Sequence, residues 1–309
     1  MHPTFLSYVP HGVREDVFFP IDEFHSQYQD MQDFKLKLFR GKEYDFVLFF
    51  NSRNIRRKSA PDALLAFKLF LDGLEPVKRD KCVFVLHTQP VDENGTNLFA
   101  VVDMLFGDDA DKRVIFSANP LPLQQMNFLY NLSDGTILLS SNEGWGLSIT
   151  ESLMAGKMII GNVTGGIQDQ MRFEDENSDW MKTSPSFATN HFGLSRKCGE
   201  WALPVFPSNH SIQGSPVTPY IIDTRVDVRD AAHAIRGLYD IEPEERTRRG
   251  LKGREWVLSK ESNMSAANMC DNIIHSLDTV FEQWTPREKY ELIKVDKRPR
   301  KFVEHPISV

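Results

Sequence analysis

The sequence predicts an α/β domain built on a doubly wound parallel sheet, and two observations carry this prediction. Short runs of Val, Ile, Leu and Phe recur along the chain without polar alternation, as in strands that are buried on both faces of a sheet. Helical patterns separate these runs, which is the order of a parallel sheet with helices on both sides. The 309 residues are enough for one large domain or two modest ones.

The apolar runs and the helical patterns can be placed in chain order. The predicted strands are Asp45–Phe50, Cys82–His87, Arg113–Ser117, Thr136–Ser140, Lys157–Gly161 and Tyr220–Asp223. Pro61 marks the start of the first crossover helix, because proline is favoured in a first turn. Further helices are expected over Pro122–Leu132, Leu147–Gly156, Asp227–Asp240, Pro243–Lys260 and Asn263–Trp284. Ligands bind such sheets beyond the carboxyl ends of the strands, so the loops that follow the strands are the first place to look for a site.

Residues 174–219 show no clear element and are rich in Ser, Pro, Asn and aromatic residues. A stretch of this length without secondary structure inside a compact domain is usually functional or disordered. We therefore predict a long insertion here.

Composition and cysteine spacing exclude several classes of protein. No apolar run approaches the roughly 20 residues that span a bilayer, and the N-terminus lacks the basic and then apolar pattern of a signal peptide. Cys82, Cys198 and Cys270 are far apart, which favours a reducing, cytoplasmic compartment over a disulfide framework. The net charge of −7 does not favour unaided nucleic-acid binding, and we interpret the basic cluster at Lys294–Lys301 as a solvated tail.

The stretch EGWGLSITE, from Glu143 to Glu151, contains two carboxylates around a glycine-rich turn. It follows the fourth predicted strand, and a helix is expected to begin near Leu147, so both carboxylates would flank the start of that helix. A helix N-terminus offers free N–H groups to an anion, whereas carboxylates accept hydrogen bonds from hydroxyls. Gly144 and Gly146 would let a ligand approach the backbone closely. The pattern indicates a ligand with a central anion and hydroxyls at both ends, as in a sugar nucleotide.

Cations are expected at the same edge of the sheet. Arg53 and Lys58 follow the first predicted strand, in the turn that leads into the helix at Pro61. Arginine binds phosphate as a fork and lysine binds it as a point charge, so this pair suits a diphosphate. We interpret Arg56 and Arg57 as solvated neighbours.

A further turn at this edge holds Gly165 and Gly166, after the fifth predicted strand. Each feature alone has an ordinary explanation: paired glutamates arise by chance in an acidic chain, and charges that follow a strand are commonly surface charges. Their order on successive loops at one edge of the sheet is what favours a binding site.

These segments resemble the C-terminal half of retaining glycosyltransferases of the GT-B fold, in the group-1 or family-4 class. That class is marked by two glutamates, E-x7-E, between a strand and a helix, as in SSNEGWGLSITESLMAGKMIIGNVTGG here. The resemblance extends to SRNIRRKSAPDALLAF, similar to the Gly-Arg…Lys-Gly segment of the class, and to YVPHGVREDVFFP, similar to its interdomain linker. It covers roughly residues 8–170 and, more weakly, 218–284. It implies a Rossmann-like donor-binding domain with C-terminal helices.

The resemblance also implies a role for each matching residue. Glu143 would bind hydroxyls of the donor sugar, and Glu151 would bind the ribose. Arg53 and Lys58 would stabilise the diphosphate as it leaves. The remaining donor-binding positions are Gly144, Trp145, Gly146, Leu147, Gly165, Gly166 and Ser117, the last at the start of a segment, SANPL, that would border the base.

The sequence departs from the class at three positions. Ser52 and Ser59 stand where glycine is usual, and Asp169 stands where glutamate is common. Serine is small, so the first two changes are expected to matter little.

No metal is expected at this site. The class has no obligatory metal, and His191, Cys198 and His210 match no zinc spacing. The resemblance therefore implies no cofactor, with the nucleotide diphosphosugar as the donor substrate.

The resemblance divides the chain into three parts. Residues 1–22 would be a linker-like segment, residues 23–284 the nucleotide-sugar-binding domain with its insertion at about 174–219, and residues 285–309 a basic tail. In the class a further domain precedes the linker and usually holds the acceptor. We expect that domain on a second chain, as in a split enzyme; a truncated chain and a stand-alone nucleotide-sugar binder are the alternatives.

The predicted function is retaining glycosyl transfer from a nucleotide diphosphosugar to an acceptor that the sequence does not identify. The alternative is a non-catalytic regulatory subunit that only binds the nucleotide sugar. The E-x7-E context disfavours an epimerase, and a phosphorylase would need a cofactor lysine that we do not identify. The partner would be a second chain with the acceptor domain, or another copy of this chain; a nucleic-acid acceptor has no supporting feature.

Overall fold

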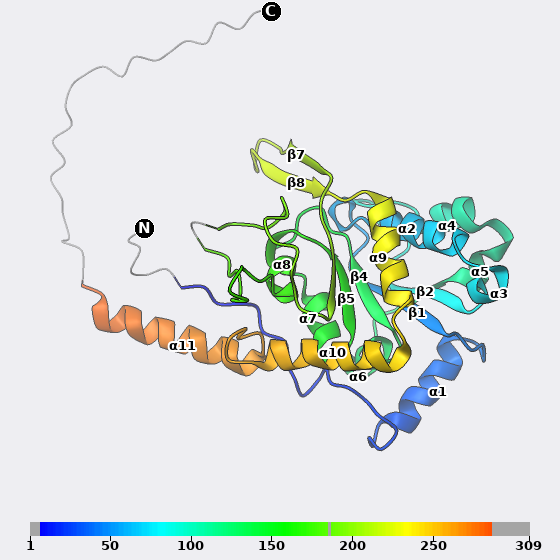
Figure 1. Cartoon of the computed structure of the whole chain (residues 1–309), viewed down its shortest axis with the longest axis horizontal. Coiled ribbons are helices and arrows are strands. Elements are labelled where there is room, and N and C mark those ends of the chain that lie inside the picture. Colours follow the sequence, from blue (N-terminus) through cyan, green and yellow to red (C-terminus); the bar gives the residue numbers. More distant parts are fainter. Residues whose placement is uncertain (1–6, 185–186, 286–309) are drawn as a thin grey trace, which may run out of the picture.

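A six-stranded parallel sheet lies at the centre of the molecule (Figure 1). The computed structural model describes residues 7–184 and 187–285. The strands follow the order β3-β2-β1-β4-β5-β6, and every neighbouring pair is parallel. Their bounds are β1 (Phe46–Asn51), β2 (Cys82–His87), β3 (Val114–Phe116), β4 (Gly135–Leu138), β5 (Met158–Asn162) and β6 (Ala202–Val205). The strand order reverses where β1 and β4 lie side by side, so a ligand crevice is expected beyond the carboxyl ends of these two strands.

Helices cover both faces of the sheet (Figure 1). One group that packs together is α2 (Ala60–Asp72), α4 (Leu98–Phe106) and α9 (Val228–Tyr239). The other is α6 (Leu123–Asn131), α7 (Leu147–Met154) and α10 (Pro243–Leu258), with α1 (Tyr28–Leu38) beside α6 and α8 (Gly165–Met171) beside α7. Shorter turns are η2 (Arg56–Lys58), α3 (Pro76–Arg79), η3 (Gly107–Asp109) and α5 (Ala110–Arg113). The doubly wound α/β fold predicted from the sequence is confirmed.

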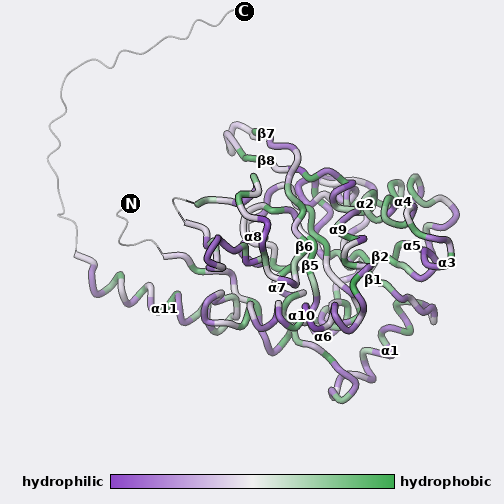
Figure 2. Tube along the Cα trace, in the orientation of Figure 1, coloured by the Kyte–Doolittle hydropathy of each residue, from purple (hydrophilic) through white to green (hydrophobic). Residues whose placement is uncertain are grey.

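The central strands are buried on both faces, which explains why they lack polar alternation. All five residues of Phe46–Phe50 in β1 are buried, and so are the first five of β2. Phe67 of α2 packs against Phe84 of β2, with ring centroids 5.2 Å apart. Hydrophobic residues concentrate along these strands, whereas the outer helices alternate between hydrophilic and hydrophobic residues (Figure 2). The apolar area buried in this core is what stabilises the sheet.

The last strand of the sheet is not the one predicted. Ile221–Arg225 forms β8, which pairs antiparallel with β7 (Asn209–Gln213) in a separate hairpin, whereas β6 completes the sheet. Both β6 and β7 lie within residues 174–219, so the prediction that this region contains no element was wrong. β6 escaped detection because it has only four residues and includes Pro204, which a sheet tolerates at its edge. β7 is polar because it is exposed on the hairpin.

The N-terminal segment meets the start of α11 (Ala266–Gln283) at one side of the domain. Val13 forms a parallel bridge with Ser265, and α11 then extends away from the sheet (Figure 1). Most of the predicted basic tail, 286–309, lies outside the described residues. Within the described part of the chain, no helix is long and apolar enough to cross a membrane. The three cysteines carry free thiols.

Candidate functional site

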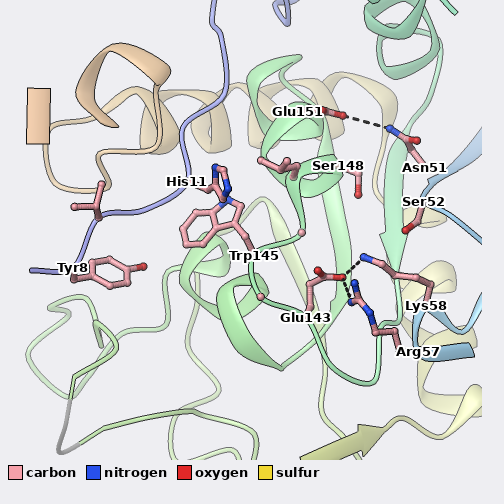
Figure 3. Close-up of a pocket in the computed structure, with 14 residues that line it drawn as sticks. Tyr8, His11, Asn51, Ser52, Arg57, Lys58, Glu143, Trp145, Ser148 and Glu151 are labelled. Carbon is pink, nitrogen blue, oxygen red and sulfur yellow. Dashed lines mark hydrogen bonds and ion pairs between the residues drawn. The ribbon is translucent and has the colours of Figure 1, made fainter. Parts of the chain in front are cut away.

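A cavity of about 750 Å³ opens beyond the carboxyl ends of β1 and β4 (Figure 3). We call it the sheet-edge pocket. Its walls come from the residues after these strands, from the first turn of α7 and from Tyr8, Val9 and His11 of the N-terminal segment. Of the predicted site residues, it brings together Lys58, Glu143, Gly144, Trp145, Gly146, Leu147 and Glu151.

The loop between β4 and α7 places the N-terminus of α7 at the pocket. Gly146 has φ +85°, a left-handed conformation that glycine adopts without steric cost, and α7 begins at the next residue. Leu147 and Ser148 of the first turn line the pocket. Ile149 N–H donates to the Gly146 carbonyl at 2.9 Å, and the other N–H groups of a first turn have no partner within the helix, so this wall suits an anion.

Two cations converge on Glu143 at one side of the pocket. The Lys58 ammonium contacts Glu143 Oε2, and the Arg57 guanidinium lies 3.2 Å from the same oxygen. Only 12% of the Lys58 side chain and 8% of the Glu143 side chain are exposed, against 44% for Arg57. Burial lowers the pKa of Lys58, and the hydrogen bond and charge of Glu143 oppose that shift. With two cations against one carboxylate, this side of the pocket holds an excess positive charge that suits a phosphate.

Glu151 lies at the other end of the pocket in a hydrogen-bonded network. The Tyr130 hydroxyl donates to Glu151 Oε2 at 2.5 Å, and the Asn51 amide donates to the same oxygen at 3.4 Å (Figure 3). Burial raises the pKa of the Glu151 carboxyl, and the hydrogen bonds from Tyr130 and Asn51 oppose this shift. The carboxylate is therefore held in a fixed position, where it can accept hydrogen bonds from the hydroxyls of a ligand.

Arg53, one of the predicted cations, does not line the pocket. Its guanidinium donates to both carboxylate oxygens of Asp92, at 2.7 and 3.2 Å, and 61% of its side chain is exposed. Arg57, interpreted from the sequence as a solvated neighbour, lines the pocket instead. The structure thus brings Arg57 rather than Arg53 to Glu143.

The chain geometry after β1 explains why Arg57, rather than Arg53, lines the pocket. Asn54 is buried, and its amide donates to the carbonyls of Pro90 and Thr96 at 3.2 and 2.7 Å, which fixes the chain there. The short turn η2 follows and carries Arg57 and Lys58 to the pocket. A single 3₁₀ turn has no sequence signature, so the rotation that it imposes could not be predicted.

Gly165 and Gly166, which follow β5, pack against the outer side of the loop that lines the pocket. A Cβ at Gly165 would lie 1.7 Å from the Glu143 carbonyl oxygen, and one at Gly166 would lie 2.5 Å from the Trp145 ring. Neither lines the pocket, although both were predicted to bind the donor. The Trp145 indole is itself buried and donates to Thr150 Oγ1 at 2.9 Å, so it holds the loop in place.

Ser117 lies outside the sheet-edge pocket. It follows β3 and its hydroxyl is 3.0 Å from His87 Nδ1, at the end of β2. It borders a separate cavity of about 560 Å³ between α1 and α6. The structure does not bring Ser117 together with the two glutamates.

Of the three positions that depart from the class, Ser52 lines the pocket, and Ser59 and Asp169 are built into the local structure. Ser59 has φ +52°, the left-handed conformation in which glycine is usual. Asp169 is 4% exposed and accepts hydrogen bonds from the Tyr8 hydroxyl at 2.6 Å and from Thr183 Oγ1 at 2.9 Å. Sequence reasoning assigned no site role to Tyr130, to Asn51 or to the pocket residues of the N-terminal segment. Asn51 directly follows a predicted strand, and the N-terminal residues lie in the segment that resembles the interdomain linker, whereas Tyr130 carried no signal.

The comparisons with known proteins identify the fold. No protein-family model matches the sequence. Over 65 residues, 21% of this chain and 16% of the relative, it is 34% identical to trehalose synthase from Pyrococcus horikoshii. It is similar to the structure of sucrose-phosphate synthase from Thermosynechococcus elongatus (TM-score 0.58, 17% identity, 89% of this chain and 52% of that chain). It is similar to Anabaena HepE in complex with UDP (TM-score 0.60, 12% identity, 88% and 57%).

A third similar structure is a single domain. It is the C-terminal domain of the group-1 glycosyltransferase LpcC from Francisella tularensis (TM-score 0.52, 15% identity, 81% of this chain and 98% of that chain). The chain has the fold of one GT-B domain. It spans about half the length of sucrose-phosphate synthase and of HepE. The Rossmann-like GT-B fold predicted from the sequence is confirmed.

Proposed function

We propose that this chain is the donor-binding domain of a retaining glycosyltransferase that uses a nucleotide diphosphosugar. One observation carries the proposal. Lys58 and Arg57 converge on Glu143 beside the first turn of α7, while Glu151 is held by Tyr130 at the other end of the same pocket. A ligand with a central diphosphate and hydroxyl groups at both ends matches this distribution of charge.

In the proposed reaction the bond between the anomeric carbon and the diphosphate oxygen breaks. The acceptor hydroxyl forms a new bond to that carbon with retention of configuration, and its proton passes to the leaving phosphate. Lys58, Arg57 and the first turn of α7 offset the charge that develops on the diphosphate. Because these protein groups supply the positive charge, we propose that no metal is required. Glu143 accepts hydrogen bonds from donor-sugar hydroxyls, and Glu151 accepts them from the ribose.

The two glutamates provide the test of this proposal. Isothermal titration calorimetry with UDP, GDP and ADP, and with a diphosphosugar of each, measures binding to the wild type and to two variants. Glu151→Gln should weaken the diphosphate and the diphosphosugar alike, because the ribose is common to both. Glu143→Gln should weaken mainly the diphosphosugar, because the bare diphosphate carries no sugar. Glu176→Gln, at an exposed position, is the control. No binding by the wild type, or equal behaviour of the two variants, would refute the proposal.

We propose further that transfer requires a second domain, on a partner chain or on a second copy of this chain. No residue of α11 is buried, and four of its apolar side chains are 43–76% exposed: Ile273, Ile274, Leu277 and Phe281. Trp284, at the end of the helix, is 58% exposed. Apolar patches of this kind usually mark an interaction surface. Transfer also needs the acceptor hydroxyl close to the anomeric carbon and bulk water kept out, which a pocket open to solvent does not provide.

A non-catalytic nucleotide-sugar-binding subunit is the second candidate function. The observation that favours it is that the cations and the helix N-terminus of the pocket would bind a diphosphosugar whether or not transfer follows. Donor turnover decides between the two. The enzyme hypothesis expects consumption of the diphosphosugar once the complementary domain and an acceptor are added, whereas a binding subunit would leave the donor intact.

A further inference from the structure

The N-terminal residues 8–13, which we call the 8–13 segment, cross one side of the sheet-edge pocket. Tyr8, Val9 and His11 all line it. In the view of Figure 3, His11 lies across the pocket from Lys58 and Arg57. The His11 side chain is exposed, so its ring nitrogens are accessible to a ligand.

The 8–13 segment is fixed at both ends. At one end the Tyr8 hydroxyl donates to Asp169 Oδ2 at 2.6 Å, and the Lys182 ammonium lies 4.8 Å from the centroid of the Tyr8 ring. At the other end the Val13 N–H donates to the Met264 carbonyl at 3.1 Å, and the Val13 carbonyl accepts from Ala266 N–H at 2.9 Å. Because both ends are held, the backbone between them has few ways to move, and His11 is carried in one place.

Asp169 is the residue that anchors the 8–13 segment at Tyr8. It is 4% exposed, and its second oxygen accepts from Thr183 Oγ1 at 2.9 Å, so the carboxylate is oriented from both sides. Burial raises the pKa of Asp169, and the hydrogen bonds from Tyr8 and Thr183 oppose that shift. The Tyr8 hydroxyl donates here, so the contact requires an acceptor oxygen at this position.

The short helix α8, which carries Asp169, also holds the pocket wall formed by the loop from Glu143 to Gly146. Gln170, the residue after Asp169, donates from its amide to the Trp145 carbonyl at 2.8 Å. Gly165, at the start of α8, packs against the Glu143 carbonyl. Since α8 holds both the 8–13 segment and the loop that carries Glu143, it sets the separation between His11 and that loop.

We infer that His11 is a donor-binding residue and that Asp169 is a positioning residue that acts on it through Tyr8. This inference rests on the proposed function, since it assigns a contact to the same ligand. The His11 imidazole donates an N–H hydrogen bond to the distal phosphate of the nucleoside diphosphate, on the side opposite the two cations. An imidazole has an N–H donor in its neutral form and two in its charged form, so the contact is available in either state.

A double-mutant cycle separates this role from a merely structural one. Affinity for UDP, GDP or ADP, whichever the wild type binds, is measured by calorimetry for His11→Ala, Tyr8→Phe, Asp169→Leu and the two combinations with His11→Ala. His11→Ala should weaken the diphosphate about tenfold, as expected for a hydrogen bond to a charged group. It should change the affinity for the matching nucleoside monophosphate much less, since that ligand has no distal phosphate. His275→Ala, on exposed α11, is the control.

Tyr8→Phe and Asp169→Leu, which leaves no acceptor oxygen for Tyr8, should each weaken diphosphate binding by a few-fold when His11 is present and have no further effect when His11 is alanine. Additive effects would overturn the positioning role, because Tyr8 and Asp169 would then act without His11. Equal losses for diphosphate and monophosphate in His11→Ala, or no loss, would overturn the phosphate contact.

A measurement without ligand keeps the two proposals distinguishable. Backbone amide exchange of residues 7–13 should become faster in Tyr8→Phe and Asp169→Leu than in the wild type, and stay unchanged in His11→Ala. Unchanged exchange in all three variants would show that Asp169 does not fix the segment. If the wild type bound no nucleoside diphosphate, the proposed function and the His11 contact would both fail, and the exchange data would still decide whether Asp169 holds the segment.

Discussion

Substitution of the cations by methionine tests the structure of the pocket directly, because the structure and the sequence motif select different arginines. Methionine keeps the apolar length of the side chain and removes the charge. A hydrogen bond to a charged group contributes roughly 1.5–3 kcal/mol. The Lys58 side chain is only 12% exposed, so Lys58→Met should lose most of this hydrogen-bond free energy. The affinity for a nucleoside diphosphate should therefore fall about tenfold to a hundredfold.

Arg57 and Arg53 form the matched comparison in this experiment. Arg57 is 44% exposed, so solvent screens its contribution, and Arg57→Met should cost about threefold to tenfold. Arg53→Met should stay within about twofold of the wild type, because Arg53 is paired with Asp92 outside the pocket. Calorimetry at low and at high salt measures all three, and the Arg57 contribution should shrink more in high salt. A loss in Arg53→Met as large as that in Arg57→Met would refute the assignment.

The remaining predictions concern stability, assembly and metal dependence. The folded-state pKa of Glu151 is raised above its ordinary 4.5, so the folded protein binds that proton more tightly than the unfolded chain does. As pH falls from the raised pKa to 4.5, the free energy of unfolding should therefore rise in the wild type relative to Glu151→Gln, as measured by denaturant titration; a constant difference would contradict this. Gly165→Ala should lower the free energy of unfolding by about 2–4 kcal/mol, because its Cβ would clash with the Glu143 carbonyl and its φ is +48°. Gly144→Ala, whose Cβ would meet nothing within 4 Å, should change the free energy of unfolding little in the same titration. Leu277→Asp with Phe281→Asp should abolish self-association or capture of the complementary domain in light scattering, with nucleotide affinity within about twofold of the wild type; persistence of the assembly would exclude α11 as the interface. A chelator should leave nucleotide affinity unchanged in calorimetry, and a loss restored by a divalent cation would contradict the metal-free proposal.

The sequence alone determined the central sheet and the position of its main loop. The strands β1, β2 and β5 were predicted because they are buried on both faces, and such burial requires unbroken apolar runs that are visible in the sequence. The turn from Glu143 into α7 was predicted for a local reason as well. Its glycines, its carboxylates and the start of the helix lie within a few residues of one another, so their proximity is set by the chain itself.

Only the tertiary structure decided which side chains meet in the pocket. Arg53 is drawn to Asp92, which lies 39 residues further along the chain, and Arg57 reaches Glu143 across 86 positions. Tyr130 meets Glu151 because α6 and α7 pack together. The strand β6 joined the sheet although its four apolar residues form too short a run, with Pro204 inside it, to indicate a strand, because the edge of β5 offered it a partner. Charge pairing, helix packing and strand pairing act through space, so the sequence names the groups that can take part, and the folded chain selects among them.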